Sequence, residues 1–312
     1  MGGFTLEGAF EGEWVHIGSE GELHVFDWNE ETTFVGLHGL ERDSESYFDL
    51  GTSGVGPSPR LTVSPASAAH RPLTLYLPEG EWRALFFATQ PARMNHVAVR
   101  EGSGGQTFDV DLLYAVREPG DAEVLEAIER MRVIYRAAGF RVGEVREHRL
   151  PDEVRDRFVT IDRGLESQDL RDLFAETVRL NQPSVPVFLV ETLGGSAGVT
   201  GSTPGTWGLF GEGATGVAVA LGEQSEMDLG VVLSHEVGHY LGLAHTSERD
   251  GTVVEGISDT LECRRTLDVS GDGTVSAEEC PEGAMNLMHW SPVGTALSAG
   301  QREQLSRCAL MY

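Results

Sequence analysis

Three histidines and one glutamate share a short segment, HEVGHYLGLAH, that runs from His235 to His245. His235 and His239 are four residues apart, so on a helix both imidazoles project from the same face and can reach one metal ion. Gly242 follows at a position that suits a left-handed helix end, where glycine has no Cβ to clash. The chain can then turn back and bring His245 to the same ion. The segment therefore predicts a helix that ends at a three-histidine metal site.

Zinc suits these ligands, because three neutral imidazoles leave its fourth tetrahedral position open to water, as catalytic zinc requires. Glu236 stands between the two helical histidines and is close enough to act as general base toward that water. The expected chemistry is hydrolysis of a peptide bond. Five fixed positions match by chance in roughly one chain of this length in ten thousand, so we set aside a merely structural role for His235.

The segment matches the extended zinc signature HExxHxxGxxH, and through it the C-terminal half of the chain resembles the metzincin metallopeptidases. The sequence between residues 213 and 305 most resembles the pappalysin family. That resemblance rests on Gly216 to Val219, Ser258-Asp259-Thr260, Cys280-Pro281, Asn286-x-Met288 and Gly300-Gln301. It implies a zinc metalloendopeptidase that acts on proteins or peptides, with an α/β domain built from a twisted mixed sheet and an active-site helix.

The resemblance also implies a Met-turn, an apolar floor beneath the zinc ligands, at Met288. Trp290 stands where pappalysins and astacins have a tyrosine that can contact zinc or the reaction intermediate. Tryptophan has an N–H donor but no hydroxyl, so we expect no role on zinc and keep Trp290 only as a candidate contact to the intermediate. No cysteine precedes Cys263, so a cysteine switch within this chain is excluded.

An acidic segment, DVSGDGTVSAEE, occupies residues 268–279. Numbered as a twelve-residue calcium loop, it has Gly273 at the sixth position and an oxygen donor at every demanding position. These donors are Asp268, Ser270, Asp272, the Thr274 carbonyl, Ser276 and Glu279. Cys280-Pro281 cannot easily continue a helix, so we expect a solitary calcium loop, with a solvated acidic hairpin as the alternative. The pappalysin resemblance also implies calcium here, with Asp259 as a further candidate ligand.

The cysteines indicate the compartment. Cys263 and Cys280 bracket the acidic segment, which predicts a local disulfide in an oxidising compartment, whereas the alternative is two unpaired buried thiols. Cys308 has no obvious partner and is expected to be a free core thiol. The first residues have neither the basic region nor the apolar run of a signal peptide. The protein is therefore cytosolic or follows a removed export signal, and the cysteines favour a secreted or cell-envelope protein.

The pattern of expected strands and helices changes near residue 107, which predicts a domain boundary there. Residues 1–106 alternate short β-like runs with Gly, Pro and Ser, which predicts a β-rich, sandwich-like accessory or pro-domain. Residues 107–312 alternate strands with helices, which predicts the α/β metallopeptidase domain. In the first part we expect strands at 14–17, 23–26, 33–37, 73–77, 82–88 and 96–100. In the second we expect strands at 108–116, 141–150, 185–192 and 213–221, helices at 121–139, 168–180 and from 298, and a loop at 194–205.

Charge and hydropathy exclude two classes of partner. With 49 acidic and 23 basic residues, the formal net charge of −26 repels nucleic acids and anionic membrane surfaces. No stretch approaches the roughly 20 apolar residues of a membrane helix, so we expect no membrane insertion, and we expect a monomer. The alternative function is a catalytically silent binding or adhesion module stabilised by zinc and calcium. Glu236 argues against it, since a silent site loses its general base without penalty, whereas Trp290 argues mildly for it.

Overall fold

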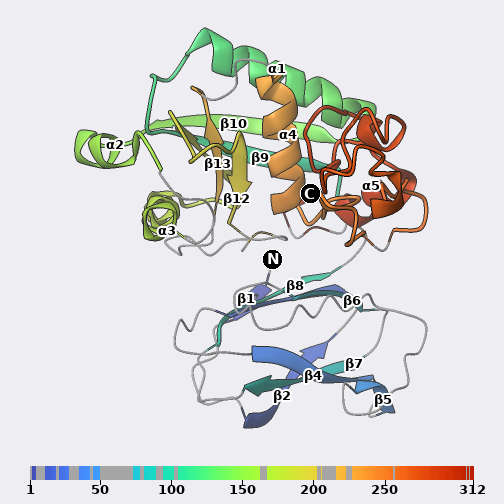
Figure 1. Ribbon diagram of the computed structural model, residues 1–312. Coiled ribbons are helices and arrows are strands. Elements are labelled where there is room, and N and C mark those ends of the chain that lie inside the picture. Colours follow the sequence, from blue (N-terminus) through green and yellow to red (C-terminus); the bar gives the residue numbers. More distant parts are fainter. Residues whose placement is uncertain are drawn as a thin grey trace. The chain divides into compact units, whose positions relative to one another are not determined.

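The computed structural model describes residues 105–161, 167–201, 205, 216–222, 227–255, 257–306, 308 and 310–312, and the backbone of eight strands between residues 2 and 101. The chain divides into two units, Met1–Ser103 and Gly104–Tyr312 (Figure 1). Among the described residues, no helix has the length and apolar character needed to cross a membrane.

The strands of the first unit form two antiparallel four-stranded sheets, in the orders β1-β8-β3-β6 and β2-β7-β4-β5. All six strands expected from the sequence are present, although the one expected at 33–37 begins later, and β1 and β5 were not predicted. The sandwich remains a prediction. The bounds are β1 Gly2–Phe4, β2 Glu11–Gly18, β3 Gly21–Asp27, β4 Val35–Arg42, β5 Glu45–Asp49, β6 Leu73–Leu77, β7 Glu81–Ala88 and β8 Met94–Glu101.

A mixed five-stranded sheet forms the centre of the second unit, in the order β10-β9-β11-β13-β12. The first four strands are parallel, and β12 pairs antiparallel to β13 at the edge. The predicted mixed sheet is therefore confirmed. The bounds are β9 Thr107–Tyr114, β10 Arg141–Arg149, β11 Val185–Val190, β12 Gly198–Thr200 and β13 Val217–Ala220.

The position of β12 corrects the sequence analysis, which expected only a loop at 194–205. Three residues of that segment form the edge strand, with Gly198 opposite Val219 and Thr200 opposite Val217. Glycine gives a weak local signal for a strand. Pairing with β13, rather than local preference, makes this segment extended.

Two helices cover one face of this sheet and pack against each other, α1 (Ala122–Ala137) and α4 (Leu229–Tyr240) (Figure 1). The side chain of Asp121 caps α1 by accepting from the backbone N–H groups of the first turn. Gly139 follows with φ +91°, as the predicted helix end requires. The ring of Tyr135 on α1 meets Phe108 of β9 edge to face, with 5.0 Å between centroids.

The other face carries α2 (Asp152–Phe158) and α3 (Gln168–Ala175), whose buried side chains share a core with Leu113 and Phe188 of the sheet. The short helix α2 was not predicted. The helix expected at 168–180 is α-helical only to Ala175 and continues as the 3₁₀ helix η1 (Glu176–Arg179).

After α4 the chain has little regular structure until its last helix. It forms the 3₁₀ helices η2 (Arg265–Leu267) and η3 (Gly283–Met285) and then α5 (Ala299–Ser306). A capping box opens α5, because Gln301 N donates to Ser298 Oγ and Ser298 N donates to Gln301 Oε1. Tyr312 closes the unit by exchanging backbone hydrogen bonds with Thr107 on β9, at 2.9 and 3.1 Å.

Candidate metal centre

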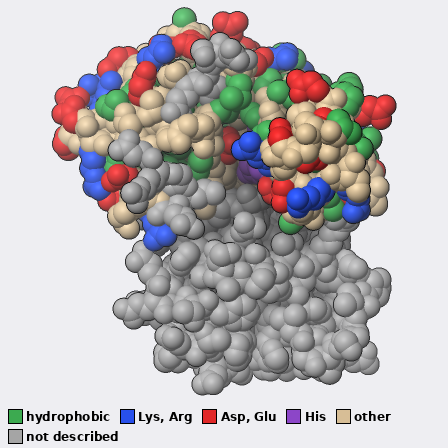
Figure 2. All heavy atoms as spheres, in the orientation of Figure 1, with side chains coloured by type: hydrophobic (Ala, Val, Ile, Leu, Met, Phe, Trp, Pro, Cys, Tyr) green, Lys and Arg blue, Asp and Glu red, His purple; other side chains and the backbone are tan. Residues whose placement is uncertain are grey.

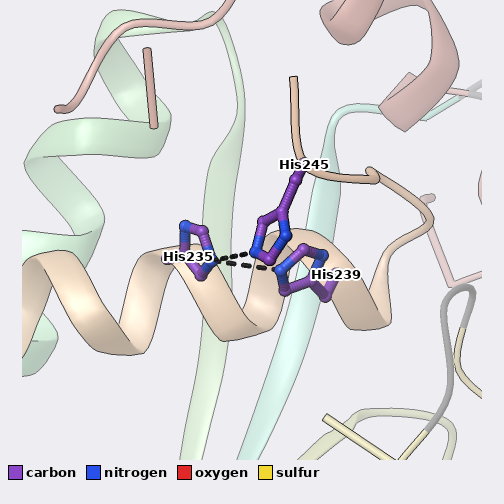
Figure 3. A group of neighbouring side chains, drawn as sticks. All are labelled: His235, His239 and His245. Carbon is purple, nitrogen blue, oxygen red and sulfur yellow. Dashed lines mark hydrogen bonds between the residues drawn. The ribbon is translucent and has the colours of Figure 1, made fainter. Parts of the chain in front are cut away.

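The Nε2 atoms of three histidines converge at the C-terminal half of α4 (Figure 3). His235 Nε2 lies 3.0 Å from that of His239 and 3.3 Å from that of His245. Candidate ligand atoms of the three residues all lie within 4.8 Å of one another. Among the described residues, this is the one group of three or more His, Cys, Asp or Glu side chains placed to share a metal ion.

Each of these imidazoles is oriented by an acceptor at its other nitrogen. His235 Nδ1 lies 2.7 Å from the Leu287 carbonyl oxygen, and His239 Nδ1 lies 2.7 Å from that of Leu243. His245 Nδ1 lies 3.1 Å from Glu248 Oε2. Because a neutral imidazole has one N–H, donation from Nδ1 leaves a lone pair on every Nε2. Three lone pairs that face one another repel. A metal ion between them would accept all three lone pairs and remove this repulsion.

Burial favours the neutral form of His235 and His239, as metal binding requires. His235 is 2 % exposed, and burial lowers its pKa to about 3. Burial likewise lowers the pKa of His239, and the neighbouring His235 adds to the effect. Near neutral pH these nitrogens therefore offer lone pairs to a metal. The donor set and its orientation fit zinc.

A glycine turn delivers the third histidine. Gly242 has φ +111°, so the predicted left-handed helix end is confirmed. The turn is closed by hydrogen bonds from Leu243 N to Gly238 O and from Gly242 N to His239 O, both 2.9 Å. The carbonyl that holds His239 belongs to the same turn. One local structure therefore orients the second ligand and redirects the chain to the third.

Glu236 lies on α4 between the first two ligands and is 8 % exposed. Its Oε2 accepts a hydrogen bond from the Thr200 hydroxyl at 2.7 Å. Burial raises the pKa of Glu236 to about 7, against the opposing effect of that hydrogen bond. A carboxylate with a pKa near neutrality suits proton transfer at physiological pH.

Met288, the residue expected to form the Met-turn, packs against α4 at Gly238, and its role as a floor beneath the zinc ligands stays a prediction. It is fully buried, and its Sδ would lie only 2.7 Å from a Cβ added to Gly238 of α4. Glycine at this helix position therefore allows the close approach. The turn is held by Asn286 Oδ1, which accepts from Met288 N at 2.8 Å, and by Thr246 N, which donates to Met288 O at 2.9 Å.

Trp290 has its N–H engaged away from the histidines. Its Nε1 donates to the Val275 carbonyl at 2.8 Å, and the Arg249 guanidinium lies 5.4 Å from the centroid of its ring. Trp290 Nε1, the candidate donor to a reaction intermediate, therefore connects the segment around Met288 to the acidic segment. A contact to the intermediate stays a prediction.

The carboxylates of the acidic segment accept backbone hydrogen bonds within the loop. Asp268 accepts from Gly271 N and Gly273 N, at 2.7 and 3.0 Å. Glu279 accepts from Ser270 N and Ser276 N, both at 2.9 Å, and these N–H groups lower its pKa to about 2. Asp272 Oδ1 accepts from Thr274 N at 2.8 Å. The predicted calcium ligands thus lie in one small loop, with Gly273 at φ +84°.

Two further predictions concern residues around this loop. The Cys263–Cys280 disulfide is formed, and Cys308 is buried and takes part in no disulfide, as expected. Asp259, in contrast, lies at the start of α5, where it accepts from Gly300 N at 2.9 Å and Ser298 Oγ at 2.8 Å. Its carboxylate thus caps α5, and a role for Asp259 as a further calcium ligand stays a prediction.

Sequence reasoning missed several residues that orient the site. Leu287 acts through a backbone carbonyl, which no side-chain pattern reveals. Thr200 lies on the unpredicted strand β12. Glu248, three residues after His245, could have been noticed, since histidine ligands are commonly held by a carboxylate.

The site is partly accessible to solvent. The His245 side chain is 23 % exposed, and Figure 2 shows histidine atoms reaching the surface, with basic and acidic side chains beside them. Acidic and basic groups are interspersed over the visible face of this unit (Figure 2).

Comparison with known proteins identifies the family. The matrixin family model matches residues 98–271, more than half of the chain. That range contains β9, α4 and all three histidines but ends before Met288. The match supports the metzincin assignment and does not support the narrower pappalysin one. No curated protein matches the chain.

Among solved structures, the crystal structure of metalloproteinase-II from Bacteroides fragilis matches with a TM-score of 0.41 and 14% sequence identity. The match covers 67% of this chain and 54% of that chain, so this chain spans about half of its length. The family match, which includes the whole HEVGHYLGLAH segment, assigns the second unit. The chain belongs to the matrixin family, a metzincin family of zinc metallopeptidases.

Proposed function

We propose that this protein is a zinc metalloendopeptidase that hydrolyses peptide bonds in proteins, with Glu236 as general base. One observation carries the proposal: the three Nε2 atoms converge while each Nδ1 is held by an acceptor. A buried carboxylate, Glu236, stands beside them on the same helix. Burial of an ionised carboxylate is unfavourable, because the charge loses its hydration. A buried glutamate beside a metal site therefore indicates a functional role, here that of a general base.

In the proposed mechanism, the chain's own groups bind the metal and move one proton. Zinc held by the three histidines would polarise the scissile carbonyl and lower the pKa of a water molecule toward neutrality. Glu236 takes a proton from this water as the oxygen attacks the carbonyl carbon. When the carbon–nitrogen bond breaks, Glu236 gives the same proton to the leaving amine. Met288, packed against Gly238, keeps the floor beneath the ligands apolar and dry.

Casein hydrolysis tests the proposal, measured before and after removal of zinc by a chelator and after zinc is restored. Glu236→Ala should keep its zinc and its melting temperature, while turnover falls by about a hundredfold or more, as expected for a general base. His239→Ala should lose zinc. A wild-type protein that binds zinc stoichiometrically but cleaves neither casein nor gelatin would instead be the silent binding module.

Calcium binding by residues 268–279 is the second part of the proposal. The oxygen donors of Asp268, Asp272 and Glu279 lie in one loop, whose glycine at the sixth position has the positive φ that such loops need. The disulfide closes this loop, and Val275 within it is buried with both cysteines. Calcium there would stabilise a segment that contacts the Met-turn through Trp290.

The cellular setting is the third part of the proposal. The disulfide supports an exported protein, secreted or in the cell envelope, because such bonds persist in oxidising compartments. We propose that residues 1–106 form an accessory or pro-domain and that residues 107–312 carry the activity as a monomer. The pappalysin relationship rests only on the landmarks between residues 213 and 305.

A further inference from the structure

The edge strand β12 contacts the side chain of Glu236 at two positions. Thr200 donates to Glu236 Oε2 at 2.7 Å. Two residues earlier on the same face of the strand, a Cβ added to Gly198 would lie 2.5 Å from Glu236 Cγ and 2.9 Å from Oε1. Val199, between them, points into the core on the opposite face of the sheet. The strand therefore holds one carboxylate oxygen and leaves space for the other.

The Thr200 hydroxyl has two acceptors within reach but only one hydrogen. Its oxygen lies 2.9 Å from the backbone carbonyl of Glu236, compared with 2.7 Å from Oε2. When Glu236 is ionised, the charged oxygen is the stronger acceptor, since charge-assisted hydrogen bonds are shorter and stronger than neutral ones. Thr200 is 8 % exposed, so little water competes for this bond.

We propose that Thr200 is a positioning residue for Glu236, whose Oε2 it holds so that Oε1, beside Gly198, is the oxygen that accepts the proton. This inference rests on the proposed function of Glu236. The proton passes from water to Oε1 while the water oxygen bonds to the carbonyl carbon, and it passes from Oε1 to the amine nitrogen when the carbon–nitrogen bond breaks. Without the anchor the carboxylate can rotate about its terminal bond, and fewer of its orientations can accept the proton.

Two substitutions separate the hydroxyl from the shape of the side chain. Thr200→Val keeps the branched shape and removes the donor, whereas Thr200→Ser keeps the donor. We expect kcat of Thr200→Val to fall about tenfold or more, because small misplacements of a catalytic group are costly. KM and zinc content should stay unchanged, and Thr200→Ser should recover most of kcat. Gly198→Ala, which fills the space beside Oε1, should also lower kcat.

A matched control is Thr177→Val. The Thr177 hydroxyl is also buried and donates to a carbonyl, that of Phe174, at 2.7 Å. Its loss should lower the melting temperature without changing kcat, so melting curves and zinc content are measured for every variant. Positioning by Thr200 is supported only if kcat falls in the Val variant and returns in the Ser variant.

Three results would overturn the inference. Thr200→Val could keep kcat within about twofold of the wild type, Thr200→Ser could be as impaired as Thr200→Val, or Thr200→Val could lose zinc. A wild-type protein without zinc-dependent hydrolysis, or a fully active Glu236→Ala, would instead refute the proposed function, and the inference with it. The wild type and Glu236→Ala are therefore assayed beside the Thr200 variants.

Discussion

The carbonyl oxygen of Leu287 lies 2.7 Å from Nδ1 of His235 and accepts its hydrogen bond. The backbone one residue before Met288 thus fixes the tautomer and the ring orientation of the first metal ligand. The segment around Met288 therefore makes two contacts with α4: the Met288 side chain packs against Gly238, and the Leu287 carbonyl orients the His235 imidazole. Whatever loosens the turn should also weaken metal binding.

Asn286→Ala should loosen the turn. Asn286 Oδ1 accepts from Met288 N, and its Nδ2 donates to Gln301 Oε1, both at 2.8 Å. Loss of these bonds should lower the free energy of unfolding by about 2 kcal/mol and weaken zinc binding. Denaturant titrations and zinc competition with a chelator measure the two effects. Asn181→Ala, at an exposed position, is the control, and equal zinc affinity in both variants would contradict this view of the turn.

Glu248→Ala should act on zinc alone. Among the described residues, Glu248 is a carboxylate that contacts a candidate ligand, with its Oε2 3.1 Å from His245 Nδ1. Its removal should raise the Kd for zinc by about tenfold, the lower end of the range for such partners. Glu282→Ala removes an equal charge from an exposed position of the same region and should leave the Kd unchanged. Identical Kd values for the two variants would show that Glu248 has no role in zinc binding.

Local signals predicted much of the second unit and the centre of its site. Asp121 and Gly139 mark the ends of α1, and Gly242 ends α4, because capping side chains and positive φ angles are properties of single positions. The three histidines were found because their ligand geometry is encoded by spacing on one helix and one turn. Such features can be predicted from neighbouring positions in the sequence, without knowing which distant residues they contact.

The missed features depend on contacts between distant residues. Thr200 meets Glu236 across 36 positions of sequence, and β12 is extended only because β13 lies beside it. The helix α2 has seven residues and no side-chain cap, too few for a helical period to stand out. The contact between Asp259 and the first turn of α5 likewise joins residues 41 positions apart.

Acid stability should depend on Asp111, which lies on β9 and is 2 % exposed. Burial raises its pKa, but hydrogen bonds from Arg146, at 2.8 and 2.9 Å, and from His148 more than offset this, so the pKa lies below the ordinary 3.8. Asp109 and Glu144 also pair with Arg146. A depressed pKa stabilises the fold above the ordinary value, and this contribution is lost as the pH falls through the folded value.

Asp111→Asn should therefore lower the free energy of unfolding at pH 7 by about 3 kcal/mol, the scale of breaking a buried ion pair. The difference from the wild type should shrink below about pH 4. Denaturant titrations between pH 7 and pH 3 measure it, and loss of zinc at low pH affects both proteins alike. Glu129→Gln, in the exposed pair with Arg132, should cost no more than about 1 kcal/mol. A difference that is constant with pH would refute the role of Asp111 ionisation.

The acidic segment is joined to both parts of the zinc site. Val275 N donates to the Arg249 carbonyl at 2.9 Å, four residues after the third ligand, and Val275 O accepts from Trp290 at 2.8 Å, two residues after Met288. Ordering of this segment should therefore stabilise the surroundings of His245 and Met288 together.

Calcium should provide that ordering. Without a cation the carboxylates of Asp268, Asp272 and Glu279 repel one another, whereas calcium draws them together. Calcium that binds only the folded state raises the melting temperature by mass action, and activity should rise with it while zinc is kept saturating. Asp272→Ala should reduce both responses, and Glu278→Ala, an exposed carboxylate at a position that does not coordinate in such loops, should not. Because Asp272 also accepts from Thr274 N, the quantity compared is the change caused by calcium, measured after prebound calcium is removed. If calcium changes neither melting nor activity of the wild type, the segment is a solvated acidic hairpin.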